Sequence, residues 1–124
     1  MSNIDVLIQE FIALTLANYN ASAMSDHKTA NLHFRAADRC ICKIKQYPDW
    51  VNMLTPLLEH DHISVRIRAA SILLPYETKK AEQTLKKCRF LQSEDGFVAQ
   101  MVLRQWRSGE LKSPSYENGK VVYK

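Results

Sequence analysis

The chain reads Leu32-His33-Phe34-Arg35-Ala36-Ala37 and, about 33 residues later, Val65-Arg66-Ile67-Arg68-Ala69-Ala70. Apolar residues return at the matching positions a third time, in Val98, Val102, Leu103 and Trp106. A repeat of this period is typical of stacked helical hairpins, each of which buries its apolar face against the next. Such modules usually bind other macromolecules through one face, so the repeat favours a binding protein.

Apolar residues spaced three and four apart predict six helices, in three antiparallel pairs. We therefore expect an all-α protein of three stacked antiparallel helical hairpins. The fifth helix is expected to turn Ala81, Leu85, Cys88 and Leu91 inward, and Gly109 suits the end of the sixth. The expected helices cover Ile4–Tyr19, His27–Tyr47, a third from Pro48-Asp49, a fourth that ends before Pro75, Thr78–Leu91 and Phe97–Arg107.

The segment after the last helix follows a different pattern. Ser113-Pro114-Ser115 breaks the helical spacing, and Asn118-Gly119 is the local signature of a tight hairpin turn. Two strands alone are marginal in water, so the segment either packs on the last helix pair, is ordered by a partner, or is loose. We expect one domain over residues 1–110 and a C-terminal extension, a short tail or hairpin, over residues 111–124.

Composition sets the outer limits. The chain has 124 residues, 46% hydrophobic and 24% charged, which is ordinary for one globular domain. Its net charge of +4 is uneven, because the first 27 residues contain three carboxylates and no Lys or Arg. The remainder could therefore attract an acidic partner or nucleic acid, or could simply be a solvated basic surface.

The sequence offers no targeting signal and little catalytic chemistry. The start lacks a basic leader and no stretch is long and apolar enough to span a bilayer, so we expect a cytoplasmic protein. Cys40, Cys42 and Cys88 are expected to be reduced thiols. His60-Asp61-His62 lacks a fourth metal ligand nearby, and the three glycines form no phosphate loop. We expect no metal, no cofactor and no enzymatic activity.

The corner His60-Asp61-His62 and the helix that follows resemble a HEAT repeat. In that family an Asp in the turn and an Arg near the start of the second helix recur, and here Asp61 and Arg66 occupy those places. Where the outer repeats would offer the same Arg, the chain has His33 and Ala99. The resemblance implies a HEAT/armadillo-like α-solenoid.

Residues 27 to 110 also resemble a small bacterial HEAT-like family of unknown function. The resemblance rests on Asn31, on Leu57-Leu58-Glu59-His60-Asp61, on Val65-Arg66 with Ala69-Ala70, and on Trp106 followed by Gly109. Members are associated with toxin and immunity loci. The resemblance therefore implies an immunity protein that binds and neutralises a cognate bacterial toxin.

In a stack of hairpins the second helices generally line the inner face. The offset of about 33 residues places polar side chains of the three repeats in register there. We predict a partner-binding face from these residues, formed by Arg35, Asp38, Arg39, Arg68, Ser71, Gln100 and Arg104. Surface salt bridging is the alternative reading of the same charges.

The predicted function is a non-catalytic protein-binding module whose charged residues speed encounter and whose apolar residues slow release. Inhibitors of nucleases tend to imitate the negative charge of nucleic acid, and this chain is basic, which counts against a nuclease toxin. Two alternatives stay open. One is a nucleic-acid-binding HEAT-like protein that uses a basic face on phosphate, and the other is a scaffold or adaptor in a larger complex.

Overall fold

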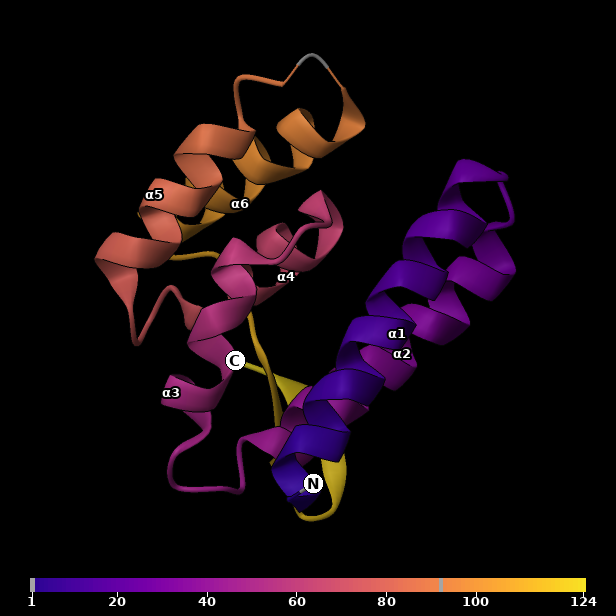
Figure 1. The fold of residues 1–124 in the computed structure, drawn as a ribbon, viewed down its shortest axis with the longest axis vertical. Helices are drawn as coiled ribbons and strands as arrows, with labels where there is room; N and C mark the ends of the chain where they lie inside the picture. The colour runs from indigo at the N-terminus through magenta and orange to yellow at the C-terminus, as the bar shows by residue number, and fades with distance from the viewer. Residues whose placement is uncertain (1, 92) are drawn as a thin grey trace. The chain divides into compact units, whose positions relative to one another are not determined.

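The computed structural model describes residues 2–91 and 93–124. These residues form six α-helices, one 3₁₀ helix and a two-stranded sheet, so the prediction of a mainly helical protein is confirmed. The chain divides into two compact units, residues 1–50 with 114–124, and residues 51–113. Figure 1 shows the elements of each unit. The single domain expected over residues 1–110 stays a prediction.

The first unit is built on two long helices, α1 (Asn3–Ala23) and α2 (His27–Ile44). The Asn18 side-chain amide donates to the carbonyl of Ala30 at 2.8 Å, and the Cys40 thiol donates to the carbonyl of Leu7 at 3.0 Å. Because residue 18 faces residue 30 while residue 7 faces residue 40, the two helices run antiparallel, side by side in Figure 1. Their shared core includes Ile4, Ile8, Phe11, Ile41 and Ile44.

Both helices differ from the expected bounds at one end. Helix α1 continues to Ala23, four residues beyond the expected end, before Ser25 adopts a positive φ of 59°. Helix α2 begins where expected, because the Asp26 carboxylate accepts from the Thr29 N–H at 3.1 Å. It ends at Ile44 and not at Tyr47, since the residues that approach Pro48 leave the helical region in a turn.

The C-terminal segment is a hairpin of β1 (Pro114–Glu117) and β2 (Lys120–Tyr123). Asn118 and Gly119 both have positive φ, 53° and 77°, which confirms the tight turn read from their sequence. The hairpin packs on α2 and belongs to the first unit, so the option of packing on the last helix pair is wrong. The Lys45 ammonium donates to the Pro114 carbonyl at 2.8 Å, which fixes one end of the hairpin.

The second unit takes up the chain where α3 (Trp50–Leu54) leads into a 3₁₀ helix, η1 (Thr55–Glu59). It then contains α4 (Ile63–Leu73), α5 (Thr78–Cys88) and α6 (Glu94–Ser108). Helix α4 contacts η1, α5 and α6, and is the central element of the unit. Fully buried side chains from four helices form its core: Leu54, Val65, Leu73, Leu85 and Leu103.

Two expected helices are shorter than predicted. The third changes from α to 3₁₀ geometry at Thr55, because Pro56 has no N–H to donate to the preceding turn and its ring crowds that turn. The fifth ends at Cys88, so Leu91, expected to point inward, is 48% exposed. The chain turns tightly there: a Cβ at Gly96 would collide with the Leu91 carbonyl oxygen.

The corner between η1 and α4 is closed by the arginine that the HEAT resemblance singled out. Arg66 donates through Nη1 to the carbonyls of His60, at 2.7 Å, and Asp61, at 2.9 Å. His62 caps α4, because its Nδ1 accepts from the Ser64 N–H at 3.1 Å. The corner is thus held by an arginine on backbone carbonyls and by an imidazole cap.

Candidate functional site

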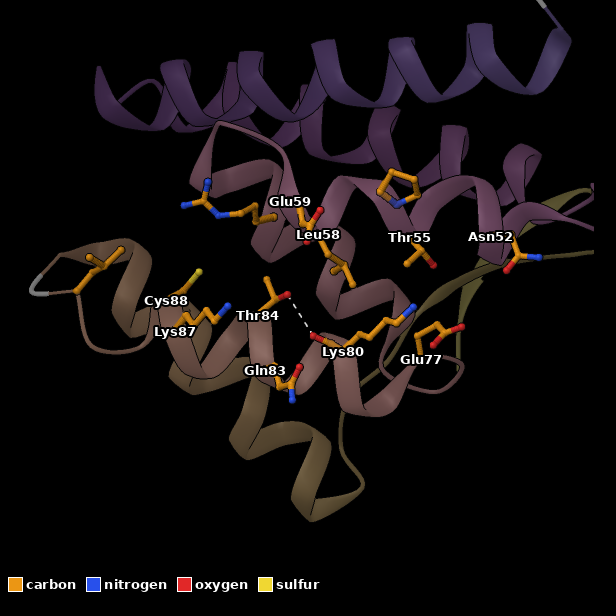
Figure 2. A pocket seen from close by; sticks show the side chains of 13 residues that line it. Asn52, Thr55, Leu58, Glu59, Glu77, Lys80, Gln83, Thr84, Lys87 and Cys88 are labelled. Carbon is orange, nitrogen blue, oxygen red and sulfur yellow. Dashed lines mark hydrogen bonds between the residues drawn. The ribbon is translucent and has the colours of Figure 1, made fainter.

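A groove of about 900 Å³ lies between η1 and α5 of the second unit (Figure 2). Charges of both signs line it, with Glu59 and Glu77 set against Arg66, Lys80 and Lys87. The remaining lining side chains are Asn52, Thr55, Pro56, Leu58, Gln83, Thr84, Cys88 and Leu91. Two carboxylates against three cations leave the lining with a small net positive charge, so the groove has no strong preference for an anion or a cation.

The two threonine hydroxyls of the groove donate hydrogen bonds to the backbone. The Thr84 hydroxyl donates to the Lys80 carbonyl at 3.1 Å, the interaction dashed in Figure 2. The Thr55 hydroxyl donates to the Val51 carbonyl at 2.6 Å, one helical turn back. Both hydroxyls therefore donate to a backbone carbonyl of the preceding helical turn, and neither is shown beside a general base.

A second hollow of about 430 Å³ has a different character. Three guanidinium side chains line it, Arg89 at the end of α5 and Arg104 and Arg107 on α6. Gln100, Leu103 and Ser108 complete the lining, so the described residues that line the hollow include no carboxylate. We refer to it as the arginine hollow. Its potential is positive, and its donors suit anions that can accept paired hydrogen bonds.

Large apolar side chains are exposed next to the arginine hollow. Phe90 is 74% exposed, and Phe97 and Met101 on α6 are 65% and 41% exposed. Phe97, Met101 and Arg104 lie within about 60° of one another around the axis of α6. The Arg89 guanidinium lies 4.9 Å from the centroid of the Phe90 ring. We name the surface of Arg89, Phe90, Phe97, Gln100, Met101, Arg104 and Arg107 the α5–α6 corner.

The structure places three predicted binding residues on α2 of the first unit. Arg35 and Arg39 are exposed there. Asp38 is only 1% exposed, and its carboxylate accepts a hydrogen bond of 2.6 Å from the Tyr123 hydroxyl. The binding role of Asp38 stays a prediction, but the carboxylate already has an internal contact that the sequence did not reveal.

The other four predicted residues belong to the second unit. Arg68 and Ser71 are half-buried on α4, and the Ser71 hydroxyl donates to the Arg68 carbonyl at 2.7 Å. Gln100 and Arg104 are exposed and meet in the arginine hollow. Sequence reasoning therefore found two residues of this hollow and missed Arg89 and Arg107. The spacing of Gln100, Arg104 and Arg107 by four and three residues was the available signal.

Two of the cysteines, Cys40 and Cys42, are buried in the first unit and have thiols of low reactivity. Burial, with a smaller contribution from the nearby Glu10 carboxylate, raises the pKa of the Cys40 thiol to about 11. Burial also raises the pKa of Cys42. At neutral pH both thiols are protonated, so neither is an activated nucleophile.

Within residues 2–91 and 93–124, no group of three or more His, Cys, Asp and Glu side chains is arranged to hold a metal ion. Within the same ranges, no helix is long and apolar enough to cross a membrane.

Comparison with known proteins yields a fold and no function. No family model matches the chain, and no curated protein matches it. The crystal structure of the protein RPA1889 from Rhodopseudomonas palustris CGA009 is similar, with a TM-score of 0.78 and 21% sequence identity. The match covers 88% of this chain and 92% of that one. At this identity the likeness shows a shared fold alone.

Proposed function

We propose that this chain is a non-catalytic protein-binding module whose partner docks on the α5–α6 corner. The observation that carries the proposal is the exposure of Phe90, Phe97 and Met101 beside three arginines. Exposed apolar clusters rimmed by polar groups mark interaction sites on folded proteins. Aromatic residues, Met and Arg are also the residue types enriched in protein interfaces and among their strongest contributors to affinity.

The more specific form of the proposal follows the family resemblance. The helices are taken as three HEAT-like hairpins, α1 with α2, α3 and η1 with α4, and α5 with α6, stacked as a short solenoid. The partner is then a cognate bacterial toxin, which the chain neutralises in the cytoplasm by covering its active site.

Nucleic-acid binding is the second candidate, and the arginine hollow is the observation that favours it. Three guanidinium groups without a lining carboxylate suit phosphate as well as carboxylate. Nucleic acid, however, requires a basic track along its backbone, and the larger groove nearby is of mixed charge. The exposed apolar side chains of the corner have a direct use in a protein interface.

Tagged protein captured from the cells that carry this gene, after nuclease treatment, tests the proposal. The double variant Phe97→Ser, Met101→Ser should lose a stoichiometric protein partner that wild-type protein retains. Val6→Ser, Leu32→Ser is the matched control, because Val6 and Leu32 are 50% and 57% exposed in the first unit. Loss of all retained material on nuclease treatment would move nucleic acid to first place. A partner retained by the first variant and lost by the second would contradict the proposed surface.

A further inference from the structure

The charge of the arginine hollow is not balanced within its own lining. Arg89, Arg104 and Arg107 contribute three permanent positive charges, and the described lining residues add only the neutral side chains of Gln100, Leu103 and Ser108. The groove between η1 and α5 differs, because Glu59 and Glu77 there offset two of its three cations. Three arginines that line one concavity give its lining a net positive charge, which a bound anion would neutralise.

The shape and neighbours of the hollow narrow the class of anion. Guanidinium groups present paired N–H donors that match the two oxygens of a carboxylate. Phe97 and Met101 continue the same face of α6, and Phe97 lies about 10 Å along the helix axis from Arg104. A ligand that spans this face therefore needs carboxylates at one end and apolar groups at the other.

We propose that the arginine hollow binds carboxylates of an acidic segment of the partner protein, while apolar side chains of the same segment pack on Phe97 and Met101. This inference rests on the proposed protein-binding function and names the chemistry that the partner brings. An acidic peptide with interspersed apolar residues satisfies both halves of the surface. A sugar-phosphate backbone satisfies only the arginines.

Fluorescence anisotropy with three labelled probes tests the inference on the full-length chain. The first probe is a peptide of about twelve residues in which pairs of glutamates alternate with leucine and phenylalanine. The second probe has serine in place of leucine and phenylalanine, and the third is single-stranded DNA of the same charge. Wild-type protein should bind the first probe at least about tenfold more tightly than the second, because the second lacks the apolar side chains that pack on Phe97 and Met101. It should also bind the first probe more tightly than the third, whose bases can stack on Phe97 but which carries no aliphatic side chains.

Variants of the arginines test whether the first probe binds in the arginine hollow. Arg104→Gln, Arg107→Gln should weaken the first probe about a hundredfold, at roughly tenfold for each charge-assisted contact. Arg104→Lys, Arg107→Lys keeps the charge and should recover only part of the loss, since an ammonium lacks the paired donors. Lys79→Gln, Lys112→Gln is the control of equal charge change at exposed positions of the same unit, and it should change the affinity less than threefold.

Each other result overturns the inference. An equal loss of affinity in Arg104→Gln, Arg107→Gln and in the control Lys79→Gln, Lys112→Gln would mean that net charge alone attracts the peptide. Arg107 lies in the last turn of α6, where its positive charge also interacts favourably with the helix dipole. If that were its whole role, Arg104→Gln, Arg107→Gln would lower the melting temperature and leave the affinity for the peptide unchanged. Tighter binding of DNA through the same arginines would replace the acidic segment by nucleic acid. The capture experiment separates this inference from the proposed function. If Phe97→Ser, Met101→Ser loses the partner and Arg104→Gln, Arg107→Gln retains it, the proposed protein-binding function still holds, but the inference of an acidic segment is wrong.

Discussion

The Tyr123 hydroxyl on β2 donates a hydrogen bond of 2.6 Å to the carboxylate of Asp38, which is 1% exposed on α2. Residues 85 positions apart in the sequence are thereby joined in one unit. A buried carboxylate is costly unless its oxygens accept hydrogen bonds. The contact gives the C-terminal hairpin a structural role, because the hairpin supplies a donor to a buried carboxylate of α2.

Replacing this donor should destabilise the protein. We expect Tyr123→Phe to lower the free energy of unfolding by about 1–3 kcal/mol, because it removes a hydrogen bond to a buried carboxylate. Urea denaturation followed by circular dichroism measures the change. Lys124→Gln is the control on the neighbouring residue, since the ion pair of Lys124 with Glu117 is exposed and worth less than about 1 kcal/mol. Equal stability of Tyr123→Phe and wild type would show that Asp38 does not need this donor.

The tight turn before α6 should not accept a side chain. A Cβ at Gly96 would overlap the Leu91 carbonyl oxygen, so Gly96→Ala should cost about 1–3 kcal/mol through forced backbone shifts. Gly109 has open space around its Cα but a φ of 78°, so Gly109→Ala should cost about 1 kcal/mol through backbone strain alone. Thermal denaturation of the two variants compares them, and a smaller loss for Gly96→Ala than for Gly109→Ala would contradict the close approach.

The corner before α4 depends on Arg66 more than on Asp61. Arg66 donates to two backbone carbonyls, so Arg66→Ala should lower the free energy of unfolding by about 1–3 kcal/mol. Asp61 is exposed and contributes its carbonyl to this contact, so Asp61→Asn should change stability by less than about 0.5 kcal/mol. Chemical denaturation distinguishes the two. A large effect of Asp61→Asn would restore the side-chain pairing that the HEAT resemblance suggests.

The buried thiol of Cys40 should make stability depend on alkaline pH. Its pKa is about 11 in the folded chain and near 9.0 when unfolded, so between pH 9 and 11 the unfolded state loses its proton first. Stability should therefore fall across this window, by at most about 2–3 kcal/mol, and be unaffected by this group below pH 9. Comparing the pH slopes of wild type and Cys40→Ala isolates the effect. Parallel slopes for the two proteins would contradict it.

Much of the fold could be predicted from local signals. Helix periodicity, Pro75, Gly109 and the Asn118-Gly119 turn each act within a few residues, and they predict the order and type of the elements better than their exact ends. Ala37, Ala70 and Leu103, aligned by the repeat, are all buried.

What the sequence could not predict depends on contacts between distant residues. The apolar spacing of α5 predicts that Leu91 is in the core, yet the helix ends at Cys88 and the chain turns to approach Gly96. The place of Asp38 in a polar row predicts a surface residue, and only the folded hairpin brings the Tyr123 hydroxyl to it. The arginine hollow combines Arg89 with residues of α6, a juxtaposition set by the packing of two helices.

Hydrogen–deuterium exchange of the chain, alone and saturated with its captured protein partner, tests the central claim most directly. If the partner docks on the α5–α6 corner, peptides that cover residues 89–107 should exchange more slowly in the complex, while peptides of α1 and α2 stay unchanged. Protection confined to residues 3–44, or spread along the groove between η1 and α5 with none at Phe97 to Arg107, would contradict the account.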